Sequence, residues 1–251
     1  MRFAAFCLLV SVAAAQQSPA PRFEVASIKL MTTPDNGSSG IRTAHGRLDA
    51  TNVTVQRCII GAWGVSPSQI AGGPDWINTD RFDISAKAGQ PTEDDAVFML
   101  MLRELLGDRF GLALHTESRP MQAYVLEVGK SGPSPAGLRK TASPDSADSS
   151  TNTNGTNTQT SITARKTSMN LLARILGREL RQPVIDRTEL AGDFDFVLSW
   201  TPDRLRAGAP ADSDLPSIFT AIQDQLGLRL RSEKVPIDVL VIDRVQKPSV
   251  N

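Results

Sequence analysis

Two eighteen-residue segments of the chain carry the same pattern at a fixed separation. The first, GLALHTESRPMQAYVLEV, covers residues 111–128, and the second, GLRLRSEKVPIDVLVIDR, covers residues 227–244. Glycine opens both segments, proline stands at the tenth position of both, and most of the apolar positions match between them. Self-similarity at a fixed offset indicates one structural unit that is used twice. This feature constrains the fold more than any other.

Within each segment, the alternation of apolar and polar side chains predicts β-strands. We expect a hairpin in each copy, with a short turn at Ser118-Arg119-Pro120 in the first. His115 of the first copy corresponds to Arg231 of the second. Because glycine, proline and the apolar positions are repeated while the histidine is not, we interpret the hairpin as scaffold.

The remaining sequence also divides into two halves with the same order of elements. In each half the predicted order is strand–helix–strand–strand–helix–strand–strand. Asp83 and Asp195 occupy matching strands, RFDISAK and DFDFVLSW. Helices with one apolar face are expected to pack on one face of small, mainly antiparallel sheets, which is an α+β architecture. We therefore predict two related α+β lobes.

Four helices are predicted from apolar side chains at helical spacing and from residues that can cap a helix start. They begin at Val53 or Thr54, at Thr92, at Thr167 or Ser168, and at Pro216. Thr92 is followed by three acidic residues, which suit the positive end of a helix dipole.

Changes in composition define the predicted domain boundaries. Residues 1–15 are a signal peptide, residues 16–130 the first lobe, residues 131–161 a low-complexity linker or surface insertion, and residues 162–251 the second lobe. Serine, threonine, asparagine, proline, aspartate and glycine dominate the third segment. Such a composition cannot bury enough apolar surface to form a core.

The first residues predict the compartment. A positive start at Met1-Arg2, an apolar run over residues 3–12 and small residues before Gln16 are typical of a secretory signal peptide. We expect an exported protein, periplasmic or extracellular, without stable membrane insertion after cleavage. Cleavage would leave Cys58 as the single cysteine, so no internal disulfide is expected.

The charge balance argues against a nucleic-acid partner. Lys+Arg and Asp+Glu are both 27, which gives a formal net charge of zero. No basic stripe interleaved with aromatic residues is present.

Several segments in combination resemble a known family. They are NVTV (52–55), WGV (63–65), QIAGGPDW (69–76), RFDI (81–84), LGDRFGL (106–112), PVIDRT (183–188) and residues 239–248. Together they resemble an exported, duplicated family of unknown function found chiefly in acidobacteria, the Solibacter-type uncharacterised proteins. Glu189 stands where that family usually has glycine, and Trp63 stands where it often has tyrosine.

The resemblance implies no established activity. Some relatives are fused behind membrane metallopeptidases of the antibiotic-sensor type, which implies a sensory or binding role outside the cytoplasm. A weaker likeness, in element order and in the phrase Leu-Leu…Phe-Gly-Leu, is to the short N-terminal signalling domain of secretins and TonB-dependent receptors. That likeness concerns the fold and implies no mechanism.

Candidate catalytic residues are few. His45 and His115 are the two histidines, and neither belongs to an HExxH motif or a short-spaced histidine pair. No GxSxG motif is present, although a Ser-His-Asp triad can be assembled from distant residues. Cys58 lies on the apolar side of a predicted helix and is interpreted as a small buried side chain. We predict no catalytic residue, no metal ligand and no cofactor.

Asp186-Arg187-Thr188-Glu189 is superficially similar to an aspartic-protease loop. That chemistry needs two carboxylates close enough to share a proton. The matching first-half region, residues 71–74, has no aspartate in register. We interpret the segment as a turn that ends a strand, in which Asp186 accepts hydrogen bonds from local amides.

Turn residues hold a tryptophan and a carboxylate together at Gly72-Gly73-Pro74-Asp75-Trp76. We propose Asp75, Trp76, Arg81 and Trp200 as contacts for a ligand or partner, such as a peptide or glycan. The alternative for both tryptophans is that they cover the edge of the core.

The leading hypothesis is a non-enzymatic binding or signalling module. It would contact an unknown envelope protein or peptide through exposed strand edges or the space between the lobes. The alternative is a periplasmic or extracellular hydrolase with its site at the lobe interface. A third hypothesis is a structural component of the envelope, which would self-assemble without a ligand.

Overall fold

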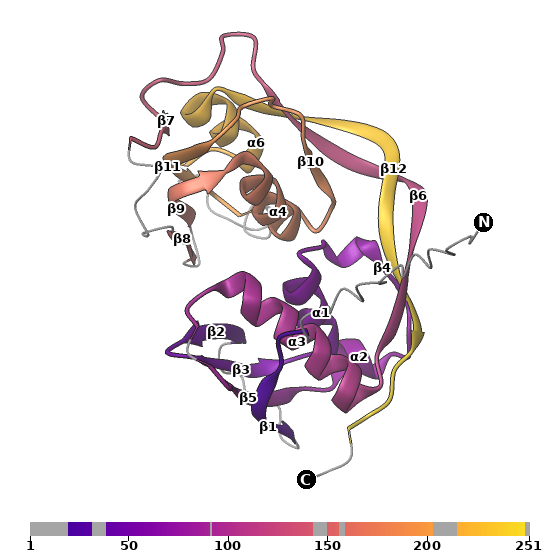
Figure 1. Cartoon of the computed structure of the whole chain (residues 1–251). Coiled ribbons are helices and arrows are strands. Elements are labelled where there is room, and N and C mark those ends of the chain that lie inside the picture. The colour runs from indigo at the N-terminus through magenta and orange to yellow at the C-terminus, as the bar shows by residue number, and fades with distance from the viewer. Residues whose placement is uncertain are drawn as a thin grey trace, which may run out of the picture.

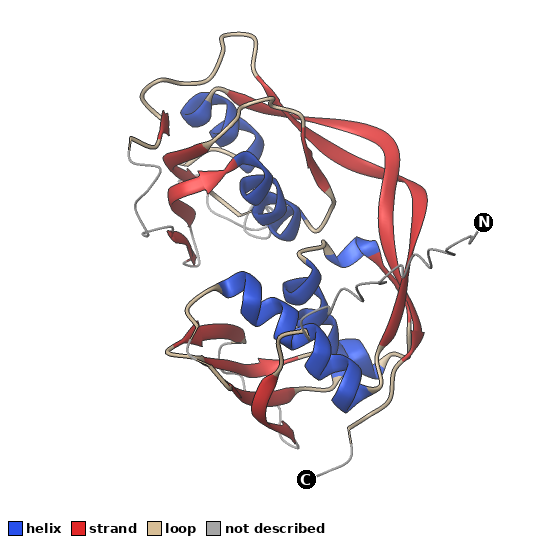
Figure 2. Ribbon diagram, viewed as in Figure 1, coloured by secondary structure: helices blue, strands red, loops and turns tan. Residues whose placement is uncertain are grey.

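The computed structural model describes residues 20–31, 39–90, 92–142, 150–155, 159–202 and 215–248. Two lobes are visible, each with a four-stranded antiparallel sheet and helices on one face, and a long pair of strands joins them (Figures 1 and 2). The predicted α+β class with small, mainly antiparallel sheets is confirmed. The predicted signal peptide lies outside the described residues. None of the helices described is long and apolar enough to cross a membrane.

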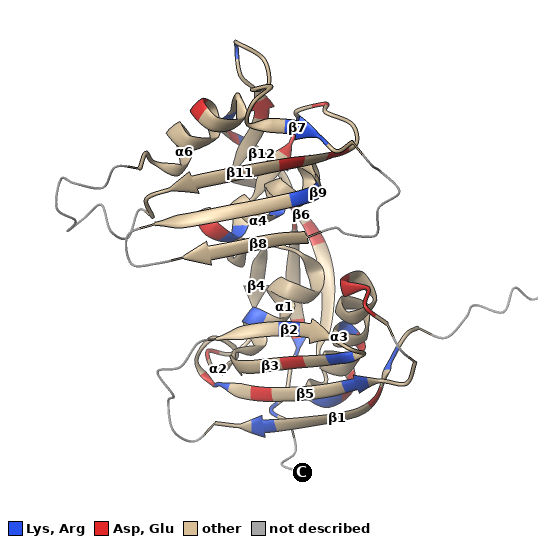
Figure 3. Cartoon of the chain, turned by 90° about the vertical axis from the view of Figure 1, so that its left-hand side faces the viewer, with Lys and Arg blue, Asp and Glu red and all other residues tan. Residues whose placement is uncertain are grey.

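The sheet of the first lobe has the strand order β1-β5-β3-β2. Its strands are β1 (Phe23–Leu30), β2 (Gly40–Ala44), β3 (Arg47–Val53) and β5 (Phe82–Ala88). Its helices are α1 (Val55–Trp63), α2 (Trp76–Thr79) and α3 (Asp95–Phe110), with the short 3-10 helix η1 (Pro67–Gln69) after α1. The helices cover one face, and the other face is open (Figure 3).

The sheet of the second lobe has the order β7-β11-β9-β8, which corresponds to the first when strands are matched in chain order. Its strands are β7 (Leu138–Lys140), β8 (Ser150–Gly155), β9 (Thr160–Ser168) and β11 (Asp193–Trp200). Its helices are α4 (Met169–Leu180), α6 (Ile218–Ala221) and the π-helical η2 (Ile222–Leu226).

Helix starts follow the predicted caps in part. Thr54 accepts a hydrogen bond from the amide of Arg57 at the start of α1, and Ser168 accepts one at the start of α4. The third helix, α3, is capped by Asp94, two residues beyond the predicted Thr92. The last helix is capped by Ser217, one residue beyond Pro216. In both shifted cases, the side-chain oxygen that accepts a hydrogen bond from a free amide of the first turn lies closer in sequence to the apolar stripe than the predicted residue does.

The segment predicted as a low-complexity linker or surface insertion, residues 131–161, contributes strands where it is described. β7 pairs with β11, β8 pairs with β9, and β9 itself begins at Thr160. Leu138 is buried, and the hydroxyl groups of Thr151 and Thr167 share a hydrogen bond of 2.8 Å. The flexible-linker interpretation does not hold for these residues. Strand pairing provides hydrogen-bond partners for the backbone groups of these residues, even though few of their side chains can enter a core.

The two predicted hairpins are wrong. Each is one continuous strand, β6 (Ala113–Val128) or β12 (Leu228–Arg244), and the two strands pair antiparallel along almost their whole length. Pro120 lies opposite Pro236 in this ladder. Proline has no amide hydrogen, so this pair must occupy a site without mutual ladder hydrogen bonds. Ser118-Arg119-Pro120 also lacks the glycine or asparagine that tight hairpin turns favour.

Short parallel strands extend the ladder at both ends. β4 (Ile70–Gly72) pairs with β12, and β10 (Val184–Asp186) pairs with β6, which gives the sheet order β10-β6-β12-β4. Leu240 and Ile242 of β12 enter the core of the first lobe. Leu126 of β6 enters the core of the second. Each lobe is therefore completed by a strand from the other half of the chain.

The matching aspartates support matching irregularities in the two outer sheets. Asp83 accepts a hydrogen bond of 2.9 Å from the amide of Asn52, and Asp195 accepts one of 2.8 Å from the amide of Lys166. Asn52 and Lys166 both have positive φ, at 53° and 49°. The strand register shifts beside both residues. These aspartates therefore hold β-bulges, which leave an unpaired amide that needs an acceptor.

Candidate functional site

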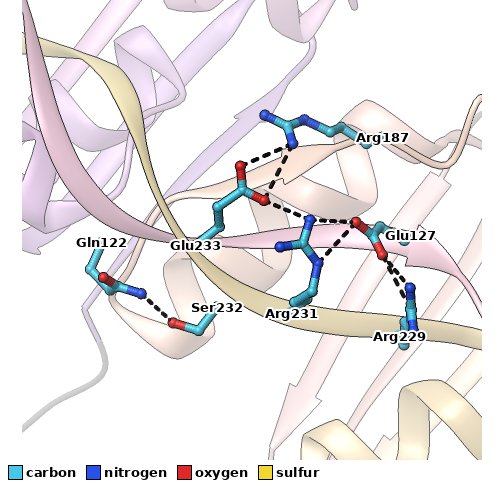
Figure 4. Close-up of polar contacts among 7 residues, drawn as sticks. All are labelled: Gln122, Glu127, Arg187, Arg229, Arg231, Ser232 and Glu233. Atoms are coloured by element: carbon cyan, nitrogen blue, oxygen red, sulfur yellow. Dashed lines mark hydrogen bonds and ion pairs between the residues drawn. The ribbon is translucent and has the colours of Figure 1, made fainter.

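Five charged side chains form a connected network on the second-lobe half of the ladder (Figure 4). We call it the ladder network; its members are Glu127, Arg187, Arg229, Arg231 and Glu233. Alternate residues of a strand share one face, which places the three β12 members together. Arg229 lies opposite Glu127 in the ladder, so the carboxylate of β6 meets the guanidinium groups of β12.

Arg231 is the centre of this network. Its Nη2 lies 2.9 Å from Glu127 Oε1 and 2.6 Å from Glu233 Oε2. Arg229 donates to the other oxygen of Glu127, with Nη2 at 2.8 Å, and Arg187 Nη1 lies 3.3 Å from Glu233 Oε1. The pKa of Glu127 is lowered by hydrogen bonds from Arg231 and then Arg229. The pKa of Glu233 is lowered mainly by the hydrogen bond from Arg231.

The other half of the ladder carries a similar arrangement centred on His115. Its Nδ1 lies 2.7 Å from Asp243 Oδ1, and its Nε2 lies 3.0 Å from Glu117 Oε1. Arg119 donates to the second oxygen of Glu117 at 2.7 Å through Nε. The hydrogen bonds to Glu117 and then to Asp243 raise the pKa of His115. His115 and Arg231, which are matched in sequence, thus each bridge two carboxylates.

This geometry describes an ion cluster better than a catalytic base. With a carboxylate at each ring nitrogen, the imidazole is favoured in its protonated form, which donates both hydrogen bonds. A protonated imidazole has no lone pair with which to accept a proton. The side chains of His115, Glu117 and Asp243 are 47%, 42% and 48% exposed. The cluster therefore lies on an open surface.

The other candidates for chemistry lie apart from this cluster. Cys58 is buried in the first-lobe core, and burial raises the pKa of its thiol to about 12. His45 lies in the turn between β2 and β3, with its ring nitrogen 3.8 Å from Glu93. In the part of the chain that the structure describes, no group of three or more His, Cys, Asp or Glu side chains could hold a metal ion.

The turn after β10 matches its predicted role. The amide and the hydroxyl of Thr188 donate to Asp186 Oδ1 at 2.9 Å and 2.8 Å. Glu189 has a φ of +58°, a conformation that glycine adopts without steric strain. Asp186, Arg187, Glu189, Leu190 and Ala191 line an open depression of about 490 Å³. Through Arg187, this depression adjoins the ladder network.

Two of the predicted contact residues lie at the start of α2. Asp75 is exposed and precedes the helix without a capping hydrogen bond from its side chain. Trp76 is partly buried: its ring meets Phe82 edge-on at 6.5 Å, and Lys247 Nζ lies 5.7 Å from its centroid. Lys247 also pairs with Asp80 at 2.7 Å. Trp76 therefore covers the edge of the first-lobe core.

The other two predicted contacts have different surroundings. Arg81 donates from Nη1 to the carbonyl of Asn52 at 3.0 Å and so supports the bulge next to β5. Trp200 is 3% exposed and belongs to the core of the second lobe. Because Trp200 is buried in the second lobe, the four residues do not form one surface.

The edge strand β1 is a feature that the sequence did not single out. β1 occupies one end of the first sheet, and the described residues pair with it only through β5. Val25 and Leu30 of this strand are 63% and 47% exposed. Its free edge lies at the end of the molecule away from the second lobe (Figure 3). Alternation in the sequence indicated a strand but could not indicate its position in the sheet.

The fold is that of a two-lobed α+β protein whose lobes share one strand ladder. The chain belongs to a family described as a protein of unknown function, DUF3738, which it matches over residues 56–245. No curated protein matches the chain. No solved structure matches it either.

Proposed function

We propose that this protein is an exported binding or signalling module that acts through protein or peptide contacts at the free edge of β1. The observation that carries the proposal is the exposure of Val25 and Leu30 on an eight-residue edge strand. An unpaired edge offers a row of amide and carbonyl groups to an added strand. The exposed apolar side chains add surface that such a strand would bury.

The composition of β1 favours this use of the edge. Proteins usually protect an edge strand with lysine, proline or an inward charge. Here Glu24 and Lys29 lie towards the two ends, and residues 25–28 are uncharged. Phe23 anchors the strand by stacking on Phe98 at a ring distance of 6.4 Å. A firmly held edge with an uncharged centre suits an extended segment rich in β-branched side chains.

Other parts of the proposal rest on the sequence. The signal-peptide pattern of residues 1–15 supports export to the periplasm or beyond. The matching strand orders of the two outer sheets support an internal repeat. On this proposal the second lobe is a related unit whose corresponding edge strand, β7, is shorter.

A comparison of two single-residue variants tests the proposal. The mature chain, residues 16–251, is used to capture proteins from an envelope extract, together with Val25→Lys and Val197→Lys. Val197 is a matched control because it is 56% exposed on β11, an inner strand of the other sheet. We expect a partner that the wild type and Val197→Lys capture and that Val25→Lys does not. Equal capture by all three would contradict the proposal, and so would self-assembly without a partner.

A further inference from the structure

Backbone hydrogen bonds fix which groups of β1 face its free edge. Just after β1, the amide of Met31 donates to the carbonyl of Arg81 at 2.9 Å, in the register of the β1–β5 pair. On the other side of β5, the amide of Ala88 donates to the carbonyl of Gly46, also at 2.9 Å. Antiparallel strands alternate between hydrogen-bonded and non-hydrogen-bonded pairs. Odd-numbered residues of β5 therefore bond to β1, and even-numbered residues bond to β3.

The register of the ladder identifies the groups at the edge. Odd-numbered residues of β5 lie opposite odd-numbered residues of β1, as Ser85 lies opposite Ser27. Successive residues of a strand direct their amide and carbonyl groups to opposite sides of the strand. Because the odd-numbered residues of β1 bond to β5, the backbone groups of Ala26, Ile28 and Leu30 point to the free edge. A strand added at this edge would form its hydrogen bonds with these three residues.

Arg109 of α3 reaches one of these edge groups. Its Nη2 donates to the carbonyl of Ala26 at 3.5 Å, a length at which a hydrogen bond is weak. Helix α3 lies over β1, because Phe98 near its start stacks on Phe23 at the start of the strand. The guanidinium group of Arg109 therefore lies at the free edge of β1, on the helix side of the sheet.

The guanidinium group of Arg109 is available for a further contact. Arg109 is exposed, and among the described residues it takes part in no ion pair. The acidic side chains of the same helix, Glu104 and Asp108, lie 3.0 Å and 3.7 Å from Arg22 instead. The negative pole of α3 favours a cation in the last turn of the helix, where Arg109 stands. That preference does not explain why its side chain reaches to β1.

We propose that Arg109 selects the partner of the β1 edge by binding a carboxylate that the added strand presents opposite Ala26. Directly opposite residues of a ladder project their side chains to the same face of the sheet. Ala26 packs against the first-lobe core, so a side chain opposite it lies on the helix side, where Arg109 is. This inference rests on the function proposed for the β1 edge.

Binding would exchange the contacts of Arg109. An amide of the added strand takes over the carbonyl of Ala26, and the guanidinium group turns to the carboxylate, whose two oxygens match its planar fork. The partner is therefore an extended peptide segment with an acidic side chain, or its own C-terminal carboxylate, at this position. A lysine at the same position would be rejected, because two cations would then lie side by side.

An array of short peptides tests the proposal. In these peptides threonine alternates with valine, and one position at a time is glutamate, glutamine or lysine. One series ends in an amide, and a second series ends in a free carboxylate. Binding of a labelled chain of residues 16–251 should favour glutamate over glutamine at one position by about three- to fivefold, the range of an exposed ion pair. A preference confined to the free-carboxylate series would identify the chain end as the ligand.

Three variants separate this inference from the function on which it rests. Arg109→Gln should lose the preference for a carboxylate but keep its binding of the glutamine peptides. Arg42→Gln, at an exposed position on the opposite edge strand β2, is the matched control and should keep the preference. Equal binding of glutamate and glutamine peptides by the wild type, or a preference that survives in Arg109→Gln, would overturn this inference alone. If no peptide binds, or if Val25→Lys binds as well as the wild type, the proposed function fails together with the inference.

Amide hydrogen exchange tests the geometry of the edge without a partner. In the free protein, the amides of Ala26, Ile28 and Leu30 should exchange faster than those of Ser27 and Lys29, which bond to β5. The peptide that binds best should slow the exchange of the first three and leave the other two unchanged. Equal protection of all five amides in the free protein would show that the edge is already paired, and both proposals would fail.

Discussion

Pro120 lies directly opposite Pro236 in the ladder that joins the two lobes. The two residues occupy the same position in the two similar segments, so each segment pairs with its own counterpart rather than folding back on itself. From this point the strands run into opposite lobes, and each strand completes the core of the lobe that the other half of the chain begins.

Truncation of Leu126 tests the exchange of strands between lobes. Leu126 belongs to β6, yet it is fully buried in the core of the second lobe. Leu126→Ala should destabilise the protein by about 2–5 kcal/mol in chemical denaturation. Hydrogen exchange should accelerate in α4 before it does in α3. Leu100→Ala, at a position 42% exposed on α3, is the control and should change stability by less than about 0.5 kcal/mol. Faster exchange confined to α3 in Leu126→Ala would contradict the assignment.

The His115 cluster predicts a specific pH dependence. The pKa of His115 is raised from its ordinary value of 6.5, first by Glu117 and then by Asp243. Its contribution to stability is therefore fully present below pH 6.5 and is lost as the pH rises through the folded-state pKa. NMR titration should show a pKa above 6.5 that falls further in Glu117→Gln than in Asp243→Asn.

His115→Arg is the matched control for this pH dependence, because arginine occupies the corresponding position 231. The variant keeps a cation between the two carboxylates at every pH used, so its stability should no longer fall across the titration range of the histidine. An unshifted His115 in the NMR titration, or the same fall in stability in His115→Arg, would show that the cluster does not form in solution.

Cys58 should be unreactive in the folded protein. The thiolate is the reactive form, and burial raises the pKa of this thiol to about 12. In a chain of residues 16–251, in which Cys58 is the single cysteine, a thiol reagent at pH 8 should label less than about a tenth of the protein until denaturant is added. Val25→Cys, at a site 63% exposed, should label at once at the new position and shows that the reagent is active. Rapid labelling of Cys58 without denaturant would mean that the first-lobe core opens.

Gly227 should tolerate substitution less well than Gly132. Both have positive φ, +70° and +80°, so alanine at either position adopts an unfavourable backbone conformation. A side-chain carbon at Gly227 would also lie 2.5 Å from the backbone nitrogen of Ser134, whereas one at Gly132 meets nothing within 4 Å. Gly227→Ala should therefore destabilise the protein by about 1–3 kcal/mol more than Gly132→Ala. Equal losses in urea denaturation would show that the loop around Ser134 moves aside.

Local features of the site could be predicted from the sequence, and contacts across the fold could not. The turn at Asp186 and the burial of Cys58 follow from residue type and immediate neighbours. Trp200 was proposed as a ligand contact because it ends a strand before a polar loop. Its burial depends on α6 and η2, which pack against β11 and come later in the chain.

The amino-acid sequence was sufficient to predict the α+β class, the four main helices, most of the strands and the correspondence of residues 111–128 with residues 227–244. These follow from side-chain periodicity and capping residues, which act over a few positions. The tertiary structure was needed to show that β6 pairs with β12, that residues 138–140 and 150–155 supply edge strands, and that each lobe takes a strand from the other half. Periodicity indicates which face of a strand is buried. Which strand it pairs with depends on the apolar surface that the whole chain buries and on the backbone hydrogen bonds that the whole chain forms.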